Sequence, residues 1–240
     1  MRDVPRISNP PQETPYFFRA MNELFADTKQ MIHAIARIRY AYSDNYRVYH
    51  TLSYHIEDML RIAYHWREDG LFSADREVTQ WKLLLASIIF HDIEQKLVPS
   101  MVGLEPDHNE KTSGIIAQKF MQEAGYSDQF TEDLTTLIYV TFEHQTHNVR
   151  PTIELAAKML CDLDLYRLGE TWEELCHDTE LLRLEYSPIA TDKTFADGRK
   201  SWAAQFLKGR DTIFQTDRAR HRESQARDNL NKTVRGLFVA

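Results

Sequence analysis

The chain has 240 residues, 42% hydrophobic and 27% charged, a composition typical of a globular protein with one substantial core. Its 8 glycines are few for the turns that many short strands require, so helices are expected. The net charge is −7 and no long basic block occurs, which disfavours an extended nucleic acid as partner. No apolar run could cross a bilayer and the N-terminus lacks a signal-peptide pattern, so we expect a cytoplasmic protein without membrane contact.

Residues 1–15 contain four prolines and are predicted to form an irregular N-terminal arm. From residue 16 onward, apolar residues recur at intervals of three and four, the helical period. The pattern predicts helices over residues 17–42, 49–66, 77–92, 109–124, 128–144, 151–168, 172–186, 192–215 and 219–238. Pro151 opens one of them and Gly169 closes it, the usual order of these residues around a helix. The sequence thus predicts an all-α bundle of about nine helices in one domain, residues 16–240.

Several histidines and aspartates lie on apolar helix faces. His55 shares a face with Met59, and His91 shares one with Ile88 and is followed directly by Asp92. Burying such groups without partners costs several kcal/mol, and a divalent metal ion would supply partners for all of them. Imidazoles with carboxylates suit Zn, Mn, Fe or Co, and the lack of nearby cysteine ligands argues against a structural zinc site.

A fourth ligand is expected from the helix predicted over residues 151–168. Asp164 falls on the apolar face that contains Cys161. Asp162 instead shares its face with Lys158, which we expect to be the solvent side. Asp164 is therefore the preferred ligand, and Asp162 is either a partner of a ligand or a surface charge.

These residues together resemble a known signature. The relevant segments are Tyr49–His50, His55–Ile56, Phe90–His91–Asp92 and Leu163–Asp164–Leu165. In order, helix context and interval they resemble the H…HD…D pattern of the HD-superfamily phosphohydrolases, and more narrowly a family of predicted bacterial HD phosphohydrolases. The resemblance covers about residues 40–235. It continues through Asn109–Ser113, Thr141–His144, Asp162–Gly169, Arg183–Tyr186, Gly198–Arg199 and Arg227–Leu230.

The resemblance implies a single HD-type helical domain with a metal-dependent phosphohydrolase activity. The substrate would be a small phosphorylated compound, such as a nucleotide, with a phosphoester or phosphoanhydride bond. One divalent ion (Mn, Mg, Co, Zn or Fe), or two, would be held by His55, His91, Asp92 and Asp164. Such an ion lowers the pKa of bound water and screens the charge that develops on phosphorus.

Other polar residues complete the predicted site. His50 is a candidate proton donor to the leaving group, and Glu110 is a candidate proton acceptor. His144 is a candidate catalytic group or extra metal ligand, and His108 and His147 are further candidate ligands. The candidates for substrate binding are Asn109, Arg183, Lys193 and Arg199, since forked donors match phosphate oxygens. Simpler interpretations stay open for several of these residues. They are a helix start for Asn109, helix capping for His144, an ion-pair network for Arg183 and a surface cation for Arg199.

Two positions depart from the family pattern. His50 and His55 are five residues apart, whereas the family spaces this pair by four. Five helical steps turn the two side chains about 140° apart, so a regular helix cannot direct both to one site. Either a π-bulge absorbs the extra residue or His50 precedes the helix. Glu94 and Gln95 stand where the family tends to have an apolar residue and a tyrosine.

Two other functions remain compatible with the sequence. A di-iron oxygenase on the same scaffold would need further histidines near the metals. A non-catalytic, metal-stabilised binding protein would follow if the spacing of His50 and His55 removed an essential group. The aromatic residues Tyr16, Phe17 and Phe18 of the N-terminal arm offer a surface for a homodimer.

Overall fold

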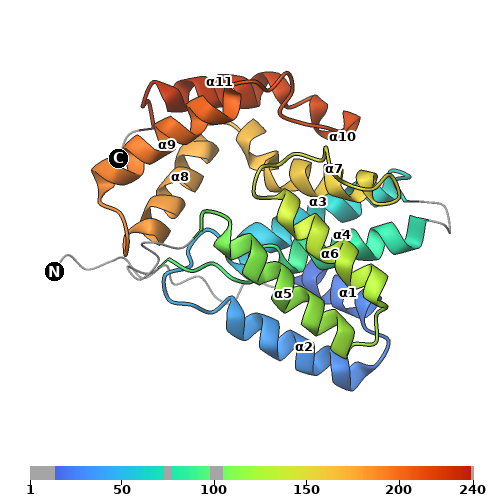
Figure 1. The fold of residues 1–240 in the computed structure, drawn as a ribbon. Coiled ribbons are helices and arrows are strands. Elements are labelled where there is room, and N and C mark those ends of the chain that lie inside the picture. The colour runs from blue at the N-terminus through green and yellow to red at the C-terminus, as the bar shows by residue number, and fades with distance from the viewer. Residues whose placement is uncertain (1–13, 73–76, 98–104, 239–240) are drawn as a thin grey trace.

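The computed structural model describes residues 14–72, 77–97 and 105–238, and these residues form helices and no strand. The α-helices are α1 (Pro15–Leu24), α2 (Thr28–Ala41), α3 (Glu57–Glu68), α4 (Val78–Phe90), α5 (His108–Glu123), α6 (Asp128–Val140), α7 (Glu154–Asp164), α8 (Trp172–Tyr186), α9 (Asp192–Leu207), α10 (Asp217–Arg220) and α11 (Glu223–Val234) (Figure 1). A π-helix, η1 (Leu52–Ile56), precedes α3, and a 3₁₀ turn, η4 (Tyr166–Gly169), follows α7.

Helix α4 lies at the centre of the bundle because it is apolar on almost every side. Every residue from Leu83 to Phe90 is buried, as expected for a helix that others surround. It contacts α1, α3, α5, α6 and α7. The hydroxyl of Ser87, the one polar group in this stretch, donates to the carbonyl oxygen of Leu83. Packing on all sides fixes the end of α4, where His91 and Asp92 follow.

Helices α8, α9 and α11 lie together on one side of this bundle (Figure 1). Helix α9 packs against α8 and α11, and α11 also contacts η4. Asn229 of α11 is fully buried and donates to the carbonyl oxygens of Leu168 and Glu170. Helices α8, α9 and α11 form a second helical layer, which is thereby joined to the end of α7, where Asp164 lies.

The described residues confirm the all-α prediction but correct its details. The helix expected over residues 17–42 is divided into α1 and α2, because Asp27 caps α2 by accepting a hydrogen bond from the amide of Gln30. The helix expected over residues 192–215 ends at Leu207. About nine helices were expected, and the described residues form eleven α-helices, of which α10 is a single turn.

The prediction of an irregular N-terminal arm can be compared with the structure only in part, because residues 1–13 lie outside the described residues. Pro15, expected in the irregular arm, starts α1. Phe17 is fully buried in the core of this chain, so it is not exposed for a dimer contact, whereas Phe18 is 40% exposed. Among the described helices, none combines the length and the apolar character that crossing a membrane requires.

The central position of α4 generates a stability prediction. Leu84 is fully buried, so Leu84→Ala should lower the free energy of unfolding by about 3 kcal/mol through lost burial and a new cavity. Ile115→Ala, at a position that is 65% exposed, is the control and should change it by no more than about 0.5 kcal/mol. Urea unfolding of both variants measures the difference. Equal effects would contradict the placement of α4.

Candidate metal centre

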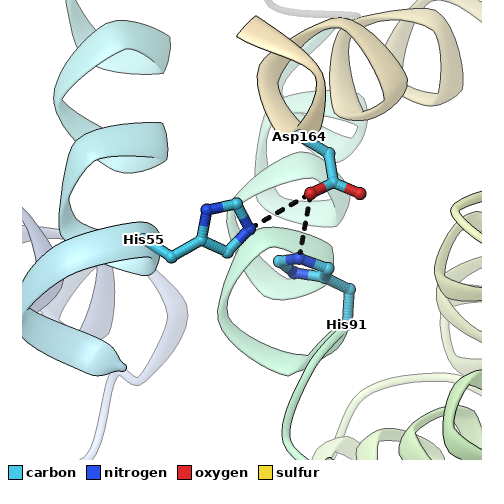
Figure 2. A group of neighbouring side chains, drawn as sticks. All are labelled: His55, His91 and Asp164. Atoms are coloured by element: carbon cyan, nitrogen blue, oxygen red, sulfur yellow. Dashed lines mark hydrogen bonds and ion pairs between the residues drawn. The ribbon is translucent and has the colours of Figure 1, made fainter. Parts of the chain in front are cut away.

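Three helical elements bring two histidines and an aspartate together. His55 comes from η1, His91 follows the last residue of α4, and Asp164 is the last residue of α7 (Figure 2). One ligand atom of each lies within 4.8 Å of the others. Nε2 of His55 is 3.1 Å from Oδ1 of Asp164, and Nε2 of His91 is 3.7 Å from the same oxygen. The structure therefore gathers three of the four predicted metal ligands.

Asp92, the fourth predicted ligand, borders this group without belonging to its tightest part. Its Oδ2 lies 3.0 Å from Nε2 of His91 and 3.7 Å from Nε2 of His55. Nε2 of His50 is 3.9 Å from the same oxygen. Asp92 thus adjoins the group of His55, His91 and Asp164, and these four predicted ligands are called the cluster below. His50 lies at the edge of the cluster.

The hydrogen bonds of His91 leave one ring nitrogen available to a metal ion. Nδ1 lies 2.9 Å from the carbonyl oxygen of Ile88 and therefore donates to it. The other nitrogen, Nε2, is buried and faces the carboxylates of Asp92 and Asp164 without a well-aligned hydrogen bond to either. Ligation of a metal ion by this nitrogen would satisfy it fully. Ligating histidines usually donate their second nitrogen to a carbonyl or carboxylate, so the residues present fit a divalent ion.

The charges within the cluster compensate one another. Burial raises the pKa of the Asp164 carboxyl, but the hydrogen bonds with His144 and His55 and the nearby His91 outweigh burial and hold that pKa well below its usual range. The pKa of His91 is raised, because the attraction of Asp92 and Asp164 for its proton exceeds the opposing effect of burial. A metal ion bound here would therefore compete with a proton for His91.

His144 approaches the opposite side of Asp164. Its Nε2 lies 2.9 Å from Oδ2 of Asp164, whereas His55 faces Oδ1. The helix expected to reach residue 144 ends at Val140, and His144 lies in the following turn with a left-handed φ of 51°. Gln215 donates to its carbonyl oxygen and helps to hold that turn. Each oxygen of the Asp164 carboxylate therefore has a histidine beside it.

Asp162 is fully buried, so the prediction that it faces solvent is wrong. Its two carboxylate oxygens accept hydrogen bonds from the backbone amides of Gln215 and Thr216, each at 2.7 Å. These residues belong to the segment between α9 and α10, which covers this face of α7. The helical periodicity of α7 alone could not reveal that cover. Asp162 thus anchors a distant segment, while Asp164 belongs to the cluster.

Both of the structural explanations expected for the five-residue spacing of His50 and His55 occur together, a π turn and a position of His50 before the helix. His50 precedes the helix, and the helix begins at Leu52 as the π-helix η1. The side chain of Thr51 caps η1 by accepting a hydrogen bond from the amide of Tyr54. The wider π turn changes the direction in which His55 leaves the helix. The two imidazole rings consequently lie with centroids 5.5 Å apart.

Glu185 of α8 orients His50. Its carboxylate is fully buried, and Oε2 accepts hydrogen bonds from the amides of Val48, Tyr49 and His50. Burial raises the pKa of Glu185, but His50 and the backbone donors outweigh burial and lower it to about 2. The carboxylate is therefore ionised, so Nδ1 of His50, 2.5 Å from Oε1, is the donor. This bond directs Nε2 of His50 towards Asp92.

Arg47 connects the chain before His50 with the turn after α4. Its guanidinium donates to the carbonyl oxygen of Asp92 at 2.7 Å and to that of Ile93 at 2.9 Å. The sequence did not identify Arg47 or Glu185 as site residues. The segment Arg183–Tyr186, noted in the family resemblance, was the available signal for Glu185. No motif marked Arg47, because its partners are backbone atoms distant in sequence.

A cavity of about 530 Å³ adjoins the cluster, and Asp92, Asp164, His144 and His50 contribute to its lining. This volume is in the range of small-molecule sites. Glu110 lines it as well. Its Oε2 is buried without a hydrogen-bond partner among the described residues, and burial raises its pKa. The cavity therefore combines a carboxyl group of raised pKa with the candidate metal ligands.

The predicted substrate-binding residues separate into two groups. Asn109, whose amide donates to Oε1 of Gln95, and Arg199 line the cavity. Arg183 is not among the lining residues and pairs instead with Glu180 and Asp192. Lys193 is 87% exposed and pairs with Asp197. The network interpretation therefore fits Arg183, and the structure brings neither Arg183 nor Lys193 to the site.

The contrast between Asp164 and Asp162 generates a prediction about metal content. Loss of a residue that only supports a metal ligand weakens metal binding roughly 10- to 100-fold. Asp164→Asn removes a ligand itself and should therefore weaken metal binding by more than that. Asp162→Asn is a matched change two residues away and should retain the wild-type metal content. Elemental analysis after dialysis against a weak chelator gives both values. Equal metal content in the two variants would contradict the assignment of Asp164.

The ionised state of Glu185 generates a pH prediction. Its pKa is depressed from 4.5 to about 2, so its stabilising contribution is present above pH 4.5 and is lost as the pH falls towards 2. Glu185→Gln, of nearly equal shape, should lower the free energy of unfolding at pH 7 by about 3 kcal/mol. The deficit should shrink below pH 4.5. A deficit independent of pH, in unfolding curves from pH 7 to pH 2, would refute this account.

Comparison with known proteins adds no assignment. No family model matches the chain, and no curated protein or solved structure matches it significantly.

Proposed function

We propose that the chain is a metal-dependent phosphohydrolase of the HD type, which hydrolyses a phosphoester or phosphoanhydride bond of a small phosphorylated compound. The observation that carries this proposal is the cluster of His55, His91 and Asp164, with Asp92 beside it, at the edge of a small-molecule cavity. The order of these residues along the chain resembles the HD signature. Their proximity in the fold supports the proposal independently of that resemblance.

His55, His91, Asp92 and Asp164 would hold the ion. A bound divalent ion would supply a hydroxide-like nucleophile near neutral pH and would neutralise charge on phosphate oxygens. The other groups then have separate roles. His50 donates Nδ1–H to Glu185 and presents Nε2 to the site, where it can protonate a leaving oxygen.

The first turn of α5, which contains Glu110, forms another side of the site. The unpartnered Oε2 of Glu110 is suited to accept a proton from a nucleophilic water. Asn109 precedes it in the first turn of α5 and also lines the cavity. A proton donor, His50, and a proton acceptor, Glu110, thus both border the cavity, as hydrolysis of a phosphate ester requires.

The arrangement favours hydrolysis over the two alternative functions. A di-iron oxygenase needs further histidines, and of the three candidates only His144 lies against the cluster. His147 is exposed, and His108 is not part of the cavity lining. A purely structural metal site would not need the buried His50–Glu185 pair or an adjoining cavity.

Hydrolysis screening across phosphate compounds tests this proposal, with Mn, Co, Mg, Zn and Fe each supplied in turn. Wild-type protein should show turnover that depends on the metal, and Asp92→Ala should lose it. His50→Gln should keep the metal and lose turnover by about 10²- to 10⁴-fold, the usual contribution of a proton donor. Lys193→Gln, at an exposed position outside the cavity, is the control and should retain full turnover. Metal-loaded, folded protein without turnover of any phosphate compound would refute the proposal and favour a binding role.

A further inference from the structure

We infer that Arg199 and the adjoining surface of α9 form an anion subsite, which binds a second anionic group of the substrate away from the group that reacts. The term substrate rests on the proposed function. The subsite itself is inferred from Arg199, Gly198 and the cavity that they line, so it can be tested without turnover.

Arg199 lines the cavity without an acidic partner. Among the described residues no carboxylate forms an ion pair with it, and its buried Nε has no hydrogen-bond partner there. The guanidinium lies over the ring of Trp202, 4.4 Å from the centroid. Cation–π contact of this kind holds an arginine in place but does not satisfy its N–H donors. Since arginine stays charged in proteins, these donors are available to an anion.

Gly198 leaves open space beside Arg199. Glycine is unfavourable inside a helix, and Gly198 lies within α9. Packing does not require it, because a Cβ at this position would meet no atom within 4 Å. Gly198 also lines the cavity. A helix position with an unfavourable residue and free space, next to an unpaired guanidinium, is consistent with a place for a ligand.

The subsite lies apart from the candidate metal ligands. Asp92 and Asp164 lie at the ends of α4 and α7, whereas Arg199 belongs to α9 in the second helical layer (Figure 1). Tyr186 of α8 lines the same cavity. Asp178, another carboxylate of the lining, pairs with Arg167. The cavity therefore has acidic metal ligands on one side and an unpaired cation on another.

This separation of charge indicates the class of substrate. A metal ion at the cluster would bind the reacting phosphate, and Arg199 would bind a further phosphate or carboxylate of the same molecule. Tyr186, Phe195 and Trp202 line the cavity and offer apolar surface to the body of the substrate. A compound with two separated anionic groups fits this cavity better than a simple phosphate monoester does.

Fluorescence of the full-length protein tests the subsite, because Trp202 adjoins Arg199. Inorganic phosphate and acetate are titrated separately, each with and without a chelator, so that the two kinds of anion and the metal site are distinguished. Phosphate, acetate or both should change the emission saturably and without need of metal, and Trp202→Phe should abolish the signal. Arg199→Gln should weaken binding at least tenfold. Arg183→Gln, where the arginine already pairs with Glu180 and Asp192, is the matched control and should bind as wild type.

Gly198→Leu provides a second variant should Arg199→Gln fail to fold. Leucine favours helix, so the melting temperature should not fall, while its side chain should occupy the open space and weaken anion binding. Unchanged binding in folded Arg199→Gln, unchanged binding in Gly198→Leu, or no saturable binding of either anion by the wild type would overturn the inference. Anion binding that survives the chelator, together with absent turnover, would retain the subsite and reject the hydrolase.

Discussion

Three histidines surround the carboxylate of Asp164. This concentration of charged and polar groups inside a helical bundle constrains the rest of the site. His55 faces one carboxylate oxygen and His144 the other, while His91 lies 3.7 Å from Oδ1. Such groups are unfavourable among apolar helices unless they compensate one another or bind an ion. The buried helix α4 fixes His91, and α7 places Asp164 opposite.

The residues around this cluster act by holding backbone in place. Glu185 fixes the chain before η1 and directs His50, while Arg47 ties the same segment to the turn after α4. Asp162 performs a similar function for the segment after α9. Buried charged groups that are satisfied by backbone amides and carbonyls fix loops that apolar packing alone would leave less constrained. The site is thus positioned by charges that lie outside the candidate ligand set.

Sequence reasoning identified the helical class and the residues of the cluster, because both depend on local periodicity and on the order of a few polar residues. It could not identify what covers each helix face. Asp162 was expected in solvent because α7 alone gives no information on the segment 215–216 that packs over it. Glu185 is separated by 135 residues from His50, and such a pairing is encoded only in the tertiary fold. Arg183 and Arg199 were both candidates for phosphate binding, and no feature of the sequence separates them. Only their partners in the structure distinguish them.

The most direct test of the account is an anomalous difference map from crystals of the full chain soaked in Mn or Zn and measured at the absorption edge of the metal. The account predicts a peak within bonding distance of His55, His91 and Asp164, with Asp92 adjoining it. A second peak between His144 and Oδ2 of Asp164 would identify a two-ion site. A metal bound elsewhere in the molecule would contradict the account. The absence of a peak in the crystals, together with the absence of metal binding by the protein in solution, would contradict it as well.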